Sequence, residues 1–117
     1  MKENLIQKES FSFAVRIIGL YKHLVEKKKE YILAKQILRS GTSIGANIEE
    51  AIGGQSKKDF ITKITIAYKE ARETHYWLRL LKETKFISEN EFNSISLDCE
   101  RIVRILGSIQ KTSKLNP

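Results

Sequence analysis

Three patterns in the sequence contain residue types that carry chemistry, and the first is a serine between two glycines. Residues 41–45 read GTSIG, which matches the G-x-S-x-G pattern of a nucleophile elbow. That motif works only where the serine lies on a strained turn between a strand and a helix. Both flanks of Ser43 have helical periodicity, and only His23 and His75 are available as a general base. We therefore interpret Ser43 as a small polar helix residue and do not expect an enzyme.

The second pattern is a basic stripe between residues 57 and 84. At about 100° per residue, five side chains of this segment fall on one helical face. They are Lys58, Lys69, Arg72, Tyr76 and Arg79, and Thr62 and Thr65 share the face. Basic side chains bind phosphates, threonine hydroxyls donate to them, and tyrosine stacks on bases. The basic stripe therefore predicts contacts with the backbone of RNA or DNA. The alternative is a solvated face with ion pairs such as Lys69 to Glu73.

The third pattern is a polar stripe within residues 36–50, opposite an apolar face. Its members are Gln36, Arg39, Ser43, Asn47 and Glu50. A buried charge must be paired, or it costs several kcal/mol. If the polar stripe is covered, Glu70, Glu73 and Thr74 of the next helix are its candidate partners, in a network inside the bundle or at a subunit interface. The alternative is that the polar stripe is simply hydrated.

The residues required for a metal site, a disulfide or a phosphate-binding loop are missing from the sequence. Di-iron sites in helical bundles use Glu-x-x-His on two helices, and no glutamate lies three residues before either histidine. Cys99 is the only cysteine, which argues against zinc and excludes an intrachain disulfide. No phosphate-cradling glycine loop occurs. We expect no metal and no cofactor.

The elements that position these residues are predicted to be helices, of which the second, residues 30–52, is central. Its apolar stripe recurs at intervals of four and three residues, at Ile37, Gly41, Ile44, Ile48 and Ala51. Gly41 and Gly45 weaken an isolated helix but allow another helix to approach closely. We therefore expect this helix at the centre of a bundle or at a subunit interface, and we expect leucine at either glycine to disrupt folding or assembly. Gly53 and Gly54 end the helix.

The first helix is predicted over residues 10–26, with a wide apolar face. One edge of that face is Phe13, Ile17, Leu20 and Leu24, and the other is Ala14, Ile18, Tyr21 and Val25. Such width is typical of a bundle helix.

The third and fourth helices are predicted over residues 57–84 and 88–110. Ser56 is a suitable N-cap for the third, and Ser88 with Glu91 forms a capping box for the fourth. The apolar seam of the fourth helix is Phe92, Ile95, Cys99, Ile102, Leu106 and Ile109. Residues 111–117 are polar and are predicted to fray.

Composition agrees with a single all-α domain, residues 1–117, folded as an antiparallel up-down-up-down four-helix bundle. Hydrophobic residues make up 41% and charged residues 30% of the chain, as in globular proteins. The net charge of +7 and the pI of about 9.6 favour acidic partners. Neither a signal peptide nor a run of roughly 18 apolar residues is present. We therefore expect a soluble cytoplasmic protein.

Two stretches, QILRSGTSIGANIEEAIGGQSKKDF and IAYKEARETHYWLRLL, resemble the bacterial four helix bundle protein family, whose founding members are encoded in intervening sequences of 23S ribosomal RNA genes. The opening SFSFAVRIIGLYKHL also fits, so the resemblance covers nearly the whole chain. The residues that fit the family pattern are Arg39, Ser40, Ser43, Ile44, Asn47, Ile48, Glu50, Phe60, Ala67, Glu70, Glu73, Trp77 and Leu78.

The resemblance implies a homo-oligomer that forms a pentameric ring. Members of the family are often labelled ribosomal proteins. It also implies a relationship to the accessory protein of diversity-generating retroelements, a basic pentamer that binds nucleic acid and a reverse transcriptase. We expect a non-enzymatic protein that binds RNA or DNA, with Lys58, Lys69, Arg72 and Arg79 contacting phosphates and Tyr76 stacking. The alternative is a scaffold that docks another protein, such as a polymerase.

Overall fold

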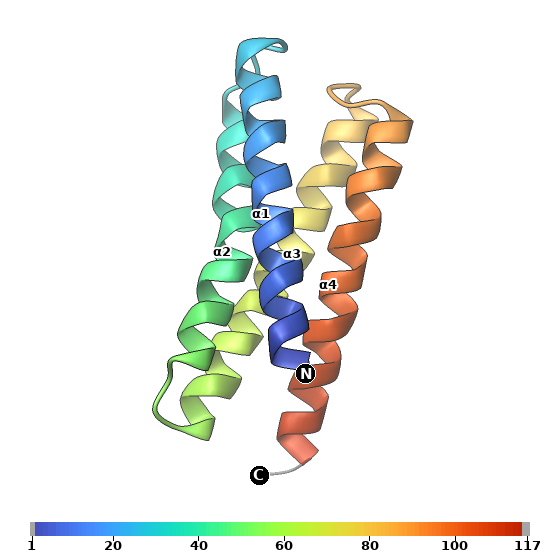
Figure 1. Ribbon diagram of the computed structural model, residues 1–117. Helices are drawn as coiled ribbons and strands as arrows, with labels where there is room; N and C mark the ends of the chain where they lie inside the picture. The colour runs from blue at the N-terminus through green and yellow to red at the C-terminus, as the bar shows by residue number, and fades with distance from the viewer. Residues whose placement is uncertain (1, 116–117) are drawn as a thin grey trace.

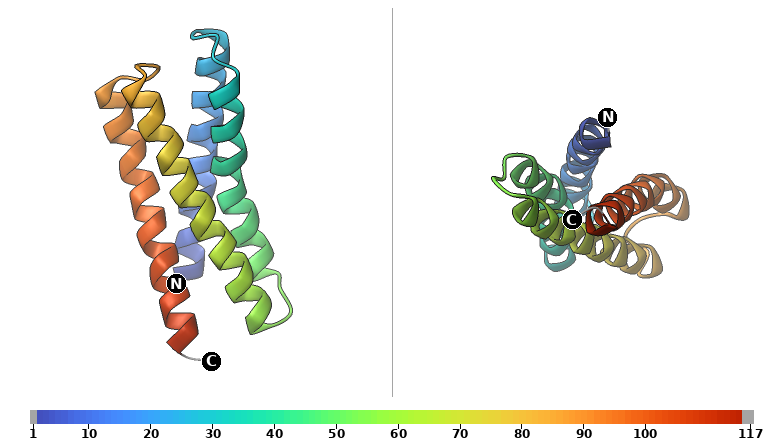
Figure 2. Two further views of the ribbon diagram at one scale, coloured as in Figure 1. Left: turned by 180° about the vertical axis from the view of Figure 1, so that it is seen from behind. Right: turned by 90° about the horizontal axis from the view of Figure 1, so that it is seen from below.

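Four α-helices form an antiparallel up-down-up-down bundle, as predicted (Figure 1). The computed structural model describes residues 2–115, with side chains from Leu5 onward. The helices are α1 (Lys2–Glu26), α2 (Ile32–Ile52), α3 (Lys57–Glu83) and α4 (Glu89–Leu115). The α1–α2 and α3–α4 connections lie at one end of the bundle and the α2–α3 connection lies at the other. Viewed along its axis, α1 is diagonal to α3 (Figure 2).

The first helix begins earlier than predicted, at Lys2 instead of residue 10. Ser10 lies inside α1, where it is buried and its hydroxyl donates to the carbonyl of Gln7 at 3.2 Å. Ile6 is buried one heptad before Phe13 and so extends the core face toward the N-terminus. The apolar stripe therefore continues past the point at which the sequence analysis began the helix.

The last helix continues beyond its predicted end at residue 110. Residues 111–115 belong to α4, so the predicted frayed tail is wrong for them, and Asn116 and Pro117 lie outside the described residues. No glycine or proline interrupts this stretch. The amide of Gln110 also donates to Thr65 of α3 at 3.1 Å, which ties the end of α4 to the bundle.

The predicted caps of the third and fourth helices are confirmed. Ser56 accepts a hydrogen bond from the backbone amide of Asp59 at 3.1 Å. Ser88 and Glu91 bond reciprocally, at 2.8 Å and 3.1 Å, as a capping box requires. The hydrogen bonds from the Ser88 backbone and hydroxyl lower the pKa of Glu91.

The core is formed by the predicted stripes of α2, α3 and α4 and by most of the predicted face of α1. The α2 stripe is fully buried, and one edge of α1 joins it through Phe13, Ile17 and Leu24. On the other edge, Tyr21 and Val25 are half-buried against the core, whereas Ile18 is 41% exposed. The predicted face is too wide at Ile18 because α1 has only two neighbours, α2 and α4, and their contacts leave its outer side free.

The close approach predicted for α2 occurs within the subunit, between Gly41 and α1. A β-carbon added at Gly41 would lie 2.8 Å from both γ-carbons of Ile17, which is fully buried. A β-carbon at Gly45 would lie 3.4 Å from the hydroxyl of Ser10, which is ordinary contact. Only Gly41 is therefore sterically required.

This difference gives a matched pair of substitutions. Gly41→Ala should lower the free energy of unfolding by about 1–2 kcal/mol, because the overpacking cost exceeds the gain in helix propensity. Gly45→Ala should leave it unchanged or raise it by up to about 1 kcal/mol. Urea denaturation of both variants measures the difference, and equal effects in the two would contradict the close-approach argument.

Candidate nucleic-acid interface

The five residues of the basic stripe are all exposed on the outer face of α3. Two of them, Arg72 and Arg79, line a pocket of about 250 Å³ between α3 and α4. We call it the arginine pocket, and its lining is Arg72, His75, Arg79, Glu100, Val103 and Arg104. Lys58 and Lys69 lie on the same face of α3 but do not line the pocket.

Tyrosine rings hold two of these arginines. Arg72 donates to the hydroxyl of Tyr68 at 3.2 Å, and its guanidinium carbon lies 5.9 Å from the centre of that ring. The guanidinium carbon of Arg79 lies 5.7 Å from the centre of the Tyr76 ring. Cation–π contact fixes a guanidinium while leaving N–H groups at its edge available to a ligand. A base stacking on that side of Tyr76 would have to displace Arg79.

The charge pattern separates the α3–α4 face from the rest of the surface. Arginines elsewhere pair with acids across helix boundaries: Arg16 with Asp98 at 2.7 Å, Arg101 with Glu9 at 3.0 Å, and Arg39 with two glutamates. Within residues 5–115, Arg72, Arg79 and Arg104 make no ion pair. Three arginines against the single carboxylate of Glu100 therefore leave the lining of the arginine pocket with a net positive charge.

The alternative view of the stripe was a solvated face, and its five residues are exposed, but the ion pair suggested between Lys69 and Glu73 does not form. Glu73 instead accepts hydrogen bonds from Arg39 of α2 and from the Trp77 indole, the latter at 2.9 Å. Burial alone would raise the pKa of Glu73, but the hydrogen bonds from Trp77 and Arg39 outweigh it, and the pKa is lowered.

Three residues of the interface were missed as site residues. His75 contacts the Ser96 hydroxyl through Nε2 at 3.2 Å, and Ser96 donates to the Glu100 carboxylate at 2.9 Å. Because the Ser96 proton is given to Glu100, His75 Nε2 carries a proton and donates to Ser96. Sequence analysis considered His75 only as a general base or a metal ligand, and it did not consider Ser96 or Glu100. Their spacing of four residues on α4 was the available signal.

The polar stripe of α2 lies in the outer groove between α2 and α3. Arg39 donates to Glu70 at 2.9 Å and to Glu73, which confirms its two predicted acidic partners. Its side chain is 49% exposed, so the stripe is hydrated as well as paired. The hydrogen bonds to Glu73 and Glu70 raise the pKa of Arg39.

The remaining predicted members of this network have other partners. Glu50 pairs with Lys63 at 2.7 Å. Ser43 donates to the carbonyl of Arg39 at 2.6 Å, and Asn47 donates to the carbonyl of Ser43 at 2.8 Å. Thr74 bonds the buried Ser40 at 2.9 Å instead of joining the stripe. Ser43 thus lies mid-helix, without the strand-to-helix turn of a nucleophile elbow.

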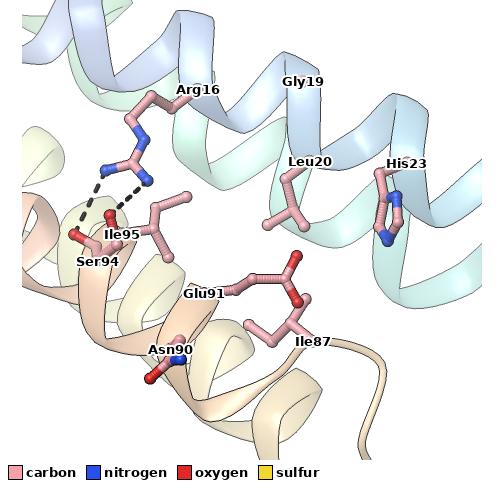
Figure 3. Close-up of a pocket in the computed structure, with 9 residues that line it drawn as sticks. All are labelled: Arg16, Gly19, Leu20, His23, Ile87, Asn90, Glu91, Ser94 and Ile95. Atoms are coloured by element: carbon pink, nitrogen blue, oxygen red, sulfur yellow. Dashed lines mark hydrogen bonds between the residues drawn. The ribbon is translucent and has the colours of Figure 1, made fainter.

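A second pocket, of about 580 Å³, lies between α1 and α4 near the connections (Figure 3). Arg16 closes one side of it with hydrogen bonds to the carbonyl and hydroxyl of Ser94, at 3.3 Å and 3.0 Å. Leu20 and His23 of α1 face Glu91 and Ile87 across the gap. The lining is mixed in charge, so it does not define a ligand class.

The described part of the chain carries neither a metal-binding cluster nor a membrane-spanning helix. No three of its His, Cys, Asp and Glu side chains are grouped so as to hold a metal ion. Between residues 2 and 115, no helix has the length and apolar content required to cross a bilayer. Burial raises the pKa of the Cys99 thiol to about 12, which makes that thiol unreactive.

Fold and surface together define a basic, up-and-down four-helix bundle. Residues 2–108 match the family model described as 23S rRNA-intervening sequence protein, and the chain belongs to that family. A crystal structure from Bacteroides thetaiotaomicron, described as a protein of unknown function from the S23 ribosomal protein family, is 54% identical and superposes with a TM-score of 0.93. The alignment covers 95% of this chain and 99% of that one. No curated protein matches the sequence.

The environment of His75 predicts a pH dependence of stability. Burial lowers the pKa of His75 from 6.5, against an opposing effect of Glu100 and with a further lowering by Arg79. Below about pH 6.5, His75 therefore binds a proton more readily in the unfolded chain than in the folded one. The free energy of unfolding should decrease as the pH falls through this range, and should level off below the folded-state pKa.

Urea denaturation at about pH 7.5 and about pH 5.5 tests this linkage. His75→Gln should reduce the loss of stability, whereas His23→Gln should retain it. Glu73 and Glu91, whose pKa values are lowered from 4.5, contribute only at more acidic pH. The same loss in the wild type and in His75→Gln would show that another group is responsible.

Proposed function

We propose that this protein is a non-enzymatic, oligomeric helical bundle that binds RNA or DNA through the phosphate backbone. The observation that carries the proposal is the set of three arginines at one pocket, none of them in an ion pair with a described residue. The net charge of +7 adds long-range attraction to an acidic polymer.

The chemistry of the arginine pocket suits phosphate. Guanidinium groups donate two parallel hydrogen bonds to a phosphate, and such charge-assisted bonds are about twice as strong as neutral ones. Lys58 and Lys69 extend the cationic surface along α3. Contacts of this kind fix position on the backbone without reading bases, so binding should be largely tolerant of sequence.

A surface on α1 supports self-association. Three apolar side chains recur there at helical spacing, and we call them the α1 apolar stripe: Phe11, 72% exposed, Val15, 56%, and Ile18, 41%. Exposed apolar stripes on helices commonly mark protein contacts. A second copy of the chain is the proposed occupant, in the pentameric ring that the family resemblance implies. A ring repeats the arginine pocket, and weak sites held together gain affinity through effective concentration.

The phosphate contacts can be tested by charge reversal. The double variant Arg72→Glu with Arg79→Glu should weaken binding of a structured RNA or a single-stranded DNA at least about tenfold at low salt. The log–log dependence of affinity on salt should lose about two units of slope. Fluorescence anisotropy at several salt concentrations measures both quantities.

A control with the same change of charge uses exposed lysines on the other side of the bundle. Lys22→Glu with Lys35→Glu should reduce affinity far less, because these residues lie away from the arginine pocket. Equal losses in the two double variants would mean that only net charge matters, and the assigned contacts would be wrong.

The α1 apolar stripe gives a second test. Phe11→Asp should convert the oligomer to a smaller species, because a buried charge without a partner is costly in an interface. Leu97→Asp is the matched control, since Leu97 of α4 is 64% exposed outside the stripe. Light scattering coupled to size exclusion measures the mass. A monomeric wild type would defeat the oligomer proposal, and dissociation by Leu97→Asp alone would place the interface on α4.

The second candidate is a protein-interaction scaffold, favoured by the same α1 apolar stripe, which phosphate binding does not explain. In that function the stripe docks another protein, such as a polymerase, and the positive charge aids solubility or encounter. It predicts negligible affinity for nucleic acid at physiological salt. It also predicts capture of a partner from lysate that Phe11→Asp abolishes and Arg72→Glu with Arg79→Glu preserves.

A further inference from the structure

The arginine pocket contains one acid, and its position is unusual for a site that binds phosphate. Glu100 lines the pocket together with Arg72, Arg79 and Arg104. Arg104 follows Glu100 by four residues, the spacing at which helical ion pairs form. Even so, no ion pair joins Glu100 to any arginine among residues 5–115. The carboxylate is therefore not used to neutralise the neighbouring cations.

A chain of hydrogen bonds through the buried Ser96 holds the exposed carboxylate instead. One oxygen of Glu100 accepts from the Ser96 hydroxyl at 2.9 Å, and the buried Ser96 accepts from His75 at 3.2 Å. The other oxygen has no hydrogen-bond partner within the described side chains. Glu100 is thus anchored on one side and keeps an acceptor available on the wall of the pocket.

A carboxylate beside a bound phosphate is repulsive unless the ligand brings a hydrogen-bond donor with it. In a nucleic-acid backbone, the ribose 2′-hydroxyl is such a donor, and DNA lacks it. Carboxylates bind ribose hydroxyls in this way in dinucleotide sites. We infer that Glu100 accepts a hydrogen bond from a ribose 2′-hydroxyl while Arg72, Arg79 and Arg104 hold the adjacent phosphates, so that the pocket selects RNA over DNA.

This inference rests on the proposed function, and the experiment separates the two. Anisotropy titrations compare a single-stranded RNA with the same sequence carrying 2′-fluoro groups, which keep the sugar shape of RNA but cannot donate. The wild type should bind the RNA about tenfold more tightly, as expected for a hydrogen bond to a charged group. Glu100→Ala should bind both oligonucleotides with nearly equal affinity.

Glu26→Ala is the matched control, because it deletes an exposed carboxylate at the end of α1, away from the pocket. It should retain the preference for the 2′-hydroxyl. Equal affinity of the wild type for both oligonucleotides would overturn the role of Glu100 and leave phosphate binding intact. A preference that survives in Glu100→Ala would also overturn it. Failure of the wild type to bind either oligonucleotide would defeat the proposed function together with this inference.

Discussion

The register of α3 against α4 is the constraint on which the candidate interface depends. Three hydrogen bonds set this register along the helices. Two join side chains, Gln110 to Thr65 and His75 to Ser96, and the third joins the Cys99 thiol to the backbone of Ala71. The Cys99 thiol donates to the Ala71 carbonyl at 3.4 Å, a contact that only a small residue on α3 allows. This register places Arg104 beside Arg72 at one pocket. A slip of one turn, about 5.4 Å, would separate the two guanidinium groups.

The distribution of ion pairs follows from the same arrangement. Pairs join α1 to α4 and α2 to α3, where acids and bases from neighbouring helices face each other. Exposed pairs of this kind contribute little to stability, typically less than about 1 kcal/mol. Their consequence here is electrostatic, because they neutralise two grooves and leave the groove between α3 and α4 positive. At the arginine pocket, by contrast, one acid, Glu100, faces three arginines and pairs with none of them.

Helical periodicity predicted the face of the helix on which each side chain lies. It did not predict the axial register of one helix against the next. The apolar stripe of α2, the caps at Ser56 and Ser88, and the pairing of Arg39 with two glutamates followed from spacing alone. Joining Arg104 to the basic stripe required the α3–α4 register, which no residue type marks. The α1 boundary was wrong because the apolar stripe was followed back only to Phe13, although Ile6 continues it. The turns gave no signal because they carry Lys29 and Lys85 at positive φ, where glycine is usual.

Tertiary packing also explains why α1 was predicted to be more buried than it is. In the single bundle α1 contacts only α2 and α4, so its outer side is exposed to solvent. That side carries Phe11, Val15 and Ile18, whereas the arginine pocket lies between α4 and α3, and α3 is diagonal to α1. The proposed assembly through α1 would therefore use a surface other than the one that carries the arginine pocket. The proposed self-association and the proposed phosphate binding would then not compete for the same residues.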